Sequence, residues 1–260
     1  MFFSAATEPG VVDSPNEDWV AVSPTVSVVL DGVTVFKGVE TGCMHGTPWY
    51  VDQLGIRLLT AASDSAVSLQ FALESAIASV ADLHADTCDL SQIGAPSAAV
   101  AIVRKSHQSL DYLVLADVTV LFDSASGLTV VSDGRVTSTV EDLAGMPNAG
   151  FEVMKRRERY RNKKDGYWVA AADPSVAKHA KVGNIPLAEV RRAAMMSDGV
   201  TRLVDTFEQT DWPGILALAF QNGPESVIER VRKIEASDKD KKRWPRFKGS
   251  DDATIVLVGA

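Results

Sequence analysis

The chain has 260 residues, of which 46% are hydrophobic and 23% charged, and its formal net charge at pH 7 is −8. This composition is typical of a globular protein with ample apolar material for a core, and it excludes a wholly disordered chain. The negative charge argues against nucleic-acid or anionic-membrane binding by the surface as a whole. No apolar run approaches the roughly 18 residues that a membrane-spanning helix requires.

The N-terminal segment and the cysteines indicate the compartment. The segment MFFSAATEPG lacks a basic stretch and a long apolar run, so we expect no signal peptide. The two cysteines, Cys43 and Cys88, form no CxxC motif, no zinc-ligand spacing and no disulfide framework. We therefore expect two reduced thiols in a cytoplasmic protein.

The first predicted elements are two strands followed by two helices, at residues 19–23, 25–30, 48–62 and 66–83. The strands are rich in β-branched residues and are separated by Pro24, which indicates a hairpin. The helices show apolar residues at three- and four-residue steps, with Asp64 and Ser65 as the expected break and cap between them.

A second group of strands follows, at residues 97–104, 110–115, 118–122 and 128–131. The turn sequences SHQS and DSASG separate these short apolar segments. Strands in succession without intervening helices predict antiparallel pairing.

The last third is expected to be mostly helical, with helices at residues 174–181, 186–194, 200–207, 212–220 and 225–236. A short strand at residues 195–197 and a buried closing strand at residues 253–258 complete it. The residues around 140–166 are polar and then basic, which indicates either a surface insertion or a charged helix. We expect the two ends of the chain to meet in one sheet, and a single domain over residues 1–260.

Basic residues are concentrated in two stretches. Residues 155–164 hold seven and residues 239–248 hold six of the 26 lysines and arginines. Such stretches are usually solvated loops or helix ends. The alternative, for residues 155–164 in particular, is a surface that docks a phosphate or an acidic partner, because dense arginines form bidentate contacts.

Three aspartates stand where apolar strands end. They are Asp31 in VSVVLDG, Asp198 in AAMMSDG and Asp251 in DDATIVLV, and two of them precede a glycine. Any one of them could simply cap a turn. If the sheet brings them together, their carboxylates repel one another unless a cation joins them. Hard divalent ions such as Mg²⁺ or Mn²⁺ prefer such oxygen ligands.

Five short elements in this order resemble motifs of one family: Asn16-Glu17-Asp18, Asp31-Gly32, Leu115-Ala116-Asp117, Ser197-Asp198-Gly199 and Asp251-Asp252-Ala253-Thr254. Together they resemble the metal-dependent protein phosphatases of type 2C, the PPM family. The resemblance implies an α+β fold, a four-layer α-β-β-α sandwich in which two antiparallel sheets pack face to face with helices on both outer faces.

The resemblance also implies a site with two Mg²⁺ or Mn²⁺ ions. By motif match, Asp31 would bridge the ions, the Gly32 carbonyl would bind one of them, and Asp198 and Asp251 would complete the direct ligands. Glu17 and Asp18 would act through metal-bound water, and Asp117 would help to hold a third ion. A water activated between two metals needs no protein nucleophile.

Three departures from the family pattern concern activity. Asp31-Gly32 is followed by Val33, where the family often has a histidine that serves as an acid, and His45 is a later candidate for that role. Asp13 stands where the family often has a phosphate-binding arginine. Arg202 stands where a further metal-binding aspartate is expected, and Asp205 lies nearby.

The sequence therefore favours a metal-dependent serine/threonine protein phosphatase whose substrate is a phosphorylated protein. The alternative is a weak or inactive phosphatase-like module that binds a phosphorylated or acidic partner. A small-molecule phosphatase is a third hypothesis, because the altered residues change the cleft.

Overall fold

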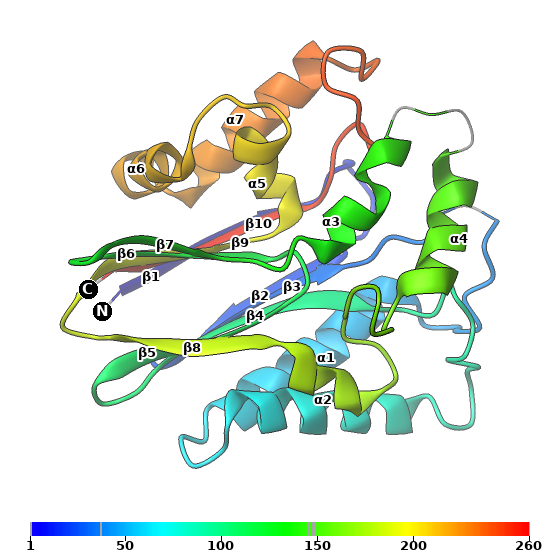
Figure 1. Ribbon diagram of the computed structural model, residues 1–260, viewed down its shortest axis with the longest axis horizontal. Coiled ribbons are helices and arrows are strands. Elements are labelled where there is room, and N and C mark those ends of the chain that lie inside the picture. The colour runs from blue at the N-terminus through cyan, green and yellow to red at the C-terminus, as the bar shows by residue number, and fades with distance from the viewer. Residues whose placement is uncertain (1, 37, 145, 147–148, 260) are drawn as a thin grey trace.

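The structure is a computed structural model, and it describes residues 2–36, 38–144, 146 and 149–259. Its centre is two antiparallel five-stranded sheets packed face to face (Figure 1). In spatial order the first sheet contains β1 (Phe2–Glu8), β10 (Ala253–Gly259), β9 (Val190–Met196), β6 (Thr119–Ser124) and β7 (Gly127–Val131). The second sheet contains β2 (Asp18–Val22), β3 (Val26–Gly32), β4 (Ala98–Lys105), β5 (Ser109–Leu115) and β8 (Lys181–Pro186).

Helices cover both outer faces of this sandwich (Figure 1). The first sheet is covered by α5 (Asp198–Asp205), α6 (Trp212–Asn222) and α7 (Pro224–Ser237). The second is covered by α1 (Gly46–Ala62), α2 (Leu69–Leu83) and the short helix η2 (Pro174–His179). The four-layer α-β-β-α prediction is therefore confirmed.

The core follows the two-residue period of the strands. In β3, Val28 and Leu30 pack against α1 and α2, whereas Val29 faces the other sheet. In β10, Ile255 packs under the helices of the first sheet and Val256 lies between the sheets. Both faces of these strands are buried, so both faces carry mainly apolar side chains. This explains the nearly continuous apolar runs in the sequences of β3 and β10.

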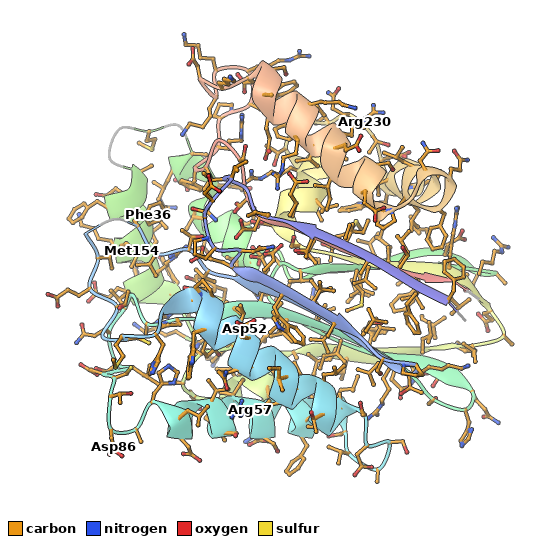
Figure 2. All side chains as sticks on the ribbon, turned by 180° about the vertical axis from the view of Figure 1, so that it is seen from behind. Phe36, Asp52, Arg57, Asp86, Met154 and Arg230 are labelled. Atoms are coloured by element: carbon orange, nitrogen blue, oxygen red, sulfur yellow. The ribbon has the colours of Figure 1, made fainter. Side chains whose placement is uncertain are left out.

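A third group of helices lies at one end of the sandwich and belongs to neither outer layer (Figure 1). It comprises α3 (Arg135–Val140), the short helix η1 (Glu141–Leu143) and α4 (Ala149–Tyr160). The first basic stretch begins in α4. Figure 2 shows Phe36, from the β3–α1 loop, beside Met154 of α4 at this end. The β3–α1 loop and α4 therefore meet where β3 and β9 end.

The structure corrects three sequence predictions. Residues 186–194 are not a helix: a turn follows β8, and β9 then runs between β10 and β6. Two neighbouring strands supply its backbone partners, and this pairing overrides the helical spacing of the sequence. The N-terminal strand β1 was not among the predicted strands; it pairs with β10, which confirms the expectation that the two ends of the chain meet in one sheet. The cap of α2 is Ser68, whose hydroxyl accepts the backbone N–H of Phe71, and not Ser65.

No helix in the described ranges combines the length and the apolar character needed to cross a membrane.

Candidate metal and phosphate site

The predicted acidic residues of β2 and β3 lie side by side. Asp18 and Asp31 are direct cross-strand partners in the antiparallel pair. Asp198 follows β9 in the opposite sheet, and its backbone N–H donates to Asp31 Oδ2 at 3.1 Å. The strand ends of both sheets thus bring carboxylates together that are 167 residues apart in sequence.

A glycine follows Asp31 and another follows Asp198, and at both positions the backbone of a second segment lies too close to leave room for a side chain. A Cβ on Gly32 would lie 2.4 Å from the Glu17 carbonyl oxygen, and one on Gly199 would lie 1.9 Å from the Asp252 carbonyl oxygen. Both distances are shorter than any real Cβ contact. The two glycines therefore let the loop before β2 and the segment before β10 pack directly behind the acidic residues.

Hydrogen bonds hold this packing in place. Both oxygens of Asp252 accept backbone N–H groups at 2.7 Å, one from Gly10 and one from Glu17. The hydroxyl of Ser197 donates to Asp18 Oδ2 at 2.8 Å and accepts the backbone N–H of Thr254 at 2.9 Å. Asp252 and Ser197 are therefore positioning residues, which connect the N-terminal loop, β9 and β10 around the site.

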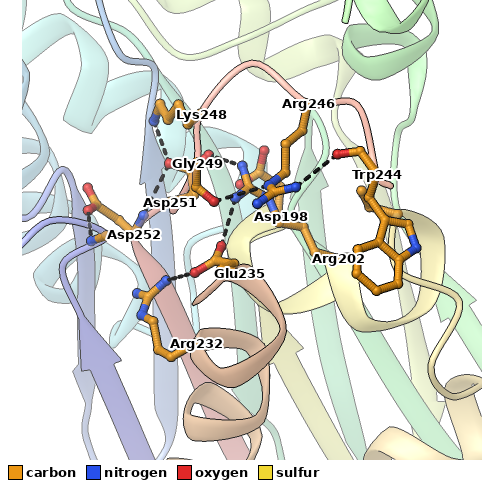
Figure 3. Close-up of polar contacts among 12 residues, drawn as sticks. Asp198, Arg202, Arg232, Glu235, Trp244, Arg246, Lys248, Gly249, Asp251 and Asp252 are labelled. Carbon is orange, nitrogen blue, oxygen red and sulfur yellow. Dashed lines mark hydrogen bonds and ion pairs between the residues drawn. The ribbon is translucent and has the colours of Figure 1, made fainter. Parts of the chain in front are cut away.

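The third predicted aspartate, Asp251, is paired with two cations (Figure 3). Arg202 donates to its Oδ2 at 2.6 Å, and Lys248 donates to its Oδ1. Arg202 is itself held by the buried Glu235 at 3.0 Å, and Arg232 completes this network on the other oxygen of Glu235 at 2.8 Å. Asp251 is thus neutralised within the protein, in contrast to Asp31.

Asp117 lies in the short connection between β5 and β6. It follows Ala116, which is buried and has a backbone φ of 70°. Positive φ is uncommon for alanine, and this conformation marks the tight turn within the predicted element Leu115-Ala116-Asp117. Thr137 of α3 donates to Asp117 Oδ2 at 3.5 Å, so the helix at the end of the sandwich contacts this carboxylate.

These groups line one cavity of about 190 Å³. Its charged lining residues are Asp31, Asp117, Glu141, Arg157, Arg161, Asp198, Arg202, Lys248 and Asp251. Glu17 and Asp18 lie behind this wall, within the hydrogen-bond network described above. The apolar part of the lining includes Phe36, Val153 and Val169. The cavity therefore has an acidic floor at the strand ends and a basic and apolar wall from α4 and its neighbours.

Arg157 is the residue of the first basic stretch that is best placed to bind an anion. It donates to the Thr34 carbonyl at 2.9 Å and lies 5.6 Å from the centre of the Phe36 ring. Among the described residues no carboxylate pairs with it, and its further N–H groups remain available. Arg161, by contrast, donates to the carbonyls of Gln92 and Ala95 and so holds a loop.

Burial and mutual repulsion raise the pKa values of the clustered acids. Burial is the largest cause in each case. It raises the pKa of Asp18 to about 7, of Asp117 to about 6 and of Asp198 to about 8, and nearby carboxylates add to the shift. The pKa of Asp31 lies well above its ordinary range, because burial is reinforced by Asp198, Asp18 and other acids. A buried acid shifts in this way when positive charge nearby is insufficient.

The donor set fits a hard divalent cation. The converging groups are carboxylate oxygens, which Mg²⁺ and Mn²⁺ prefer, and their raised pKa values show an excess of negative charge that such an ion would relieve. Asp251 fits less simply, since Arg202 and Lys248 occupy its oxygens.

Two residues considered from the sequence lie elsewhere. Asp13 is exposed in the loop between β1 and β2 and does not line the cavity, so it presents no anion there. His45 also does not line it. Its ring lies within hydrogen-bonding range of two sulfurs, at 3.4 Å from Cys88 Sγ and 3.7 Å from Cys43 Sγ. The proposed acid role of His45 is therefore not supported by its position.

The structure brings the two cysteines together with two histidines, an arrangement that was not predicted from the sequence. Cys43, His45, His84 and Cys88 each place one ligand atom within 4.8 Å of the others. The sequence signal was present as Cys-x-His followed by His-x₃-Cys, but the ligands come from different elements, so neither half has the spacing of a familiar zinc motif. The pairing of Arg202 with Asp251 and Glu235 was likewise not predicted.

No model of a protein family matches the sequence, and no curated protein is found to match it. Solved structures do match its fold. Stp1 from Staphylococcus aureus, a serine/threonine phosphatase, has a TM-score of 0.63 at 12% identity, over 99% of this chain and 94% of that chain. The catalytic domain of the serine/threonine protein phosphatase PstP, in complex with 2 manganese ions, has a TM-score of 0.59 at 16% identity, over 98% and 96%.

A third match is MsPP from Mycobacterium smegmatis, a PPM Ser-Thr phosphatase in complex with cacodylate, with a TM-score of 0.58 at 16% identity, over 100% of this chain and 98% of that chain. These matches extend over almost the full length of this chain and of each solved chain. The chain therefore has the fold of the PPM serine/threonine phosphatases.

Proposed function

We propose that this protein is a metal-dependent phosphatase that hydrolyses phosphomonoesters, with phosphoserine or phosphothreonine in proteins as the substrate class. The observation that carries the proposal is the convergence of Asp31, Asp198 and Asp117, with raised pKa values, in a cavity that Arg157 also lines. The fold shared with serine/threonine phosphatases supports the substrate class.

The residues that would hold Mg²⁺ or Mn²⁺ are Asp31 and Asp198, together with the Gly32 carbonyl and Asp251. Glu17, Asp18 and Asp117 would act as further oxygen ligands or through water. When bound, two such ions lower the pKa of a coordinated water and offset the negative charge that develops on the phosphoryl group.

The remaining roles belong to the protein. Arg157 would bind the phosphate oxygens of the substrate through its free N–H groups, because a guanidinium matches a phosphate bidentately. Phe36 and the valines of the cavity wall would exclude water from the bound ester. Asp252 and Ser197 would keep Glu17 and Asp18 behind the ligands.

The direct test is hydrolysis of p-nitrophenyl phosphate and of a phosphothreonine peptide by the purified protein with added Mn²⁺. We expect turnover that EDTA abolishes and that the Asp31→Asn variant loses. Asp13→Asn is the matched control, since Asp13 is exposed outside the cavity, and it should retain the parent rate. Turnover without metal would contradict the proposal. Metal binding by calorimetry without any turnover would instead favour the alternative, an inactive phosphatase-like module that binds a phosphorylated or acidic partner.

A further inference from the structure

A second cluster of metal-ligating side chains lies away from the carboxylate cavity. Cys43 and His45 belong to the loop that leads from β3 into α1, and His84 and Cys88 follow the C-terminal end of α2. Both cysteines of the chain and two of its 4 histidines are gathered here. Asp86, which stands between the last two ligand residues, lies at the outer edge of the molecule (Figure 2).

Two of the distances within the cluster fall in the range of a tetrahedral metal site. With Zn–S of about 2.3 Å and Zn–N of about 2.0–2.1 Å, a tetrahedral zinc ion places its ligand atoms about 3.4–3.8 Å apart. His45 Nδ1 lies 3.4 Å from Cys88 Sγ and 3.7 Å from Cys43 Sγ. All four ligand atoms lie within 4.8 Å of one another. Small side-chain movements would complete the tetrahedron.

His84 supplies an independent observation that points to a ligand. This residue is 1% exposed, and its Nδ1 lies 2.8 Å from the Val80 carbonyl oxygen, to which it donates. In the neutral ring this bond makes Nε2 an acceptor, and among the described residues this buried nitrogen has no hydrogen-bond partner. A buried acceptor without a partner is costly. A histidine that donates one nitrogen to a carbonyl and offers the other to a metal is the usual arrangement around zinc.

The surrounding contacts hold the ligands in place. The ring of Trp49 stacks on His45 at 4.1 Å and meets His84 edge-on at 4.9 Å. The backbone N–H of His45 donates to Cys43 Sγ at 3.3 Å. The Asp89 N–H donates to the Gly42 carbonyl at 2.7 Å, so the segments that carry the ligands are also tied through their backbones.

We propose that Cys43, His45, His84 and Cys88 form a closed structural site for a single Zn²⁺ ion. Two thiolates and two neutral imidazoles are soft and borderline ligands that suit zinc, whereas the carboxylate cavity suits hard ions. On binding, each thiol releases its proton to solvent as its sulfur bonds to the metal. The proposal does not depend on phosphatase activity.

The consequence of such a site is that it fixes the loop between β3 and α1. That loop begins just after Asp31 and carries Thr34 and Phe36, which line the carboxylate cavity. Its far end would be fastened through zinc to the end of α2. Zinc would thus stabilise the fold and also keep the cavity wall, including the carbonyl that holds Arg157, in position.

The test uses the tag-free, reduced protein carrying Asp31→Asn and Asp198→Asn, so that the carboxylate cavity contributes little to metal binding. Titration with Co²⁺ should give the visible bands of a tetrahedral ion and a thiolate-to-cobalt charge-transfer band in the near ultraviolet, both reaching a plateau at one equivalent. Added Zn²⁺ should displace the cobalt and remove both bands. Zinc at about a thousand times its Kd should raise the Tm by about 8 °C or more.

Cys43→Ser and Cys88→Ser should each weaken or abolish the charge-transfer band, and neither change empties a buried apolar position. His107→Ala, a histidine in the turn after β4, is the control and should bind like the parent. A reduced parent protein that shows no charge-transfer band, or a band that Cys88→Ser leaves unchanged, would overturn the proposal. So would a Cys43–Cys88 disulfide in the protein as isolated, if its reduction yields no metal binding.

Discussion

Asp18 of β2 and Asp31 of β3 face each other as direct partners across two antiparallel strands. Like charges in this position destabilise a sheet. Here the cost is increased by burial, since Asp18 is only 7% exposed, and by the carboxylate of Asp198, which adds to the repulsion at Asp31. The pair therefore lowers the stability of the folded protein, and a role in binding a divalent ion, as proposed above, would explain why it is present.

The stability of the metal-free protein should fall as the pH rises. The folded pKa values of Asp18, Asp117 and Asp198, about 7, 6 and 8, lie above that of an unfolded aspartate, so the native state binds more protons between about pH 4 and 8. Raising the pH through this window removes those protons at a cost to the native state. We expect a Tm about 5–10 °C higher at pH 6 than at pH 9 in EDTA, by calorimetry.

Two comparisons test whether the buried carboxylates cause this pH dependence of the Tm. Asp198→Asn removes one of the raised groups and should flatten the dependence, chiefly by raising the Tm at high pH. Saturating Mn²⁺ should do the same in the parent protein. If the Tm rises with pH in EDTA, the carboxylates are not destabilised as described.

Arg157→Ala should weaken substrate binding and turnover together. The side chain lies in the cavity without an acidic partner among the described residues, and a charge-assisted contact to phosphate contributes about 1.5–3 kcal/mol. We expect kcat/KM for p-nitrophenyl phosphate to fall by about 10–100-fold. Arg159→Ala, on the exposed side of the same helix, is the matched control. Equal effects of the two changes would exclude a specific role for Arg157.

Glu235→Ala should be strongly destabilising. This residue is 3% exposed and holds Arg202 and Arg232 at 3.0 and 2.8 Å, so its removal takes from the buried Arg202 one of its two carboxylate partners and leaves only Asp251. The loss of charge-assisted hydrogen bonds of this kind typically costs about 1.5–3 kcal/mol. Glu229→Ala removes an exposed pair with Lys233 on the same helix and should cost less than about 1 kcal/mol. Denaturant unfolding of the two variants measures the difference.

Gly199→Ala should disturb both stability and the site. A Cβ there would lie 1.9 Å from the Asp252 carbonyl oxygen, which cannot move without displacing β10. We expect a loss of about 1–3 kcal/mol, as for overpacked cores, and weaker Mn²⁺ binding by calorimetry. Gly249→Ala faces open space and should behave like the parent. A stable Gly199→Ala protein with normal metal binding would contradict the role assigned to the close contact between Gly199 and the Asp252 backbone.

The reaction should depend strongly on the leaving group. Neither Val33 nor His45 provides an acid in the cavity, and among the described lining residues there is no histidine. General acid catalysis typically contributes about 10²–10⁴-fold, so alkyl phosphates should react that much more slowly than aryl phosphates with good leaving groups. Rates for a series of substituted phenyl phosphates provide the measurement. If the rate does not depend on the leaving group, a proton donor must act in the cavity, and the prediction is contradicted.

The sequence by itself determined most of the local architecture and the identity of the acidic residues. Alternation along β3, β4 and β10 and the helical spacing of α1 and α2 come from short-range periodicity, which the chain carries in every window. The same periodicity located the strand ends near which four aspartates stand: Asp31, Asp117, Asp198 and Asp251. The order of the short motifs that contain them was enough to indicate the fold.

Only the tertiary structure decided which of these residues meet one another and which groups oppose them. The β-structure of 190–194 depends on pairing with β6 and β10, which no local pattern encodes. The pairing of Arg202 with Asp251, the entry of Arg157 into the cavity and the gathering of Cys43 with Cys88 all join segments that are tens of residues or more apart. Contacts of that kind are set by packing of whole layers, and so they cannot be read from neighbouring residues.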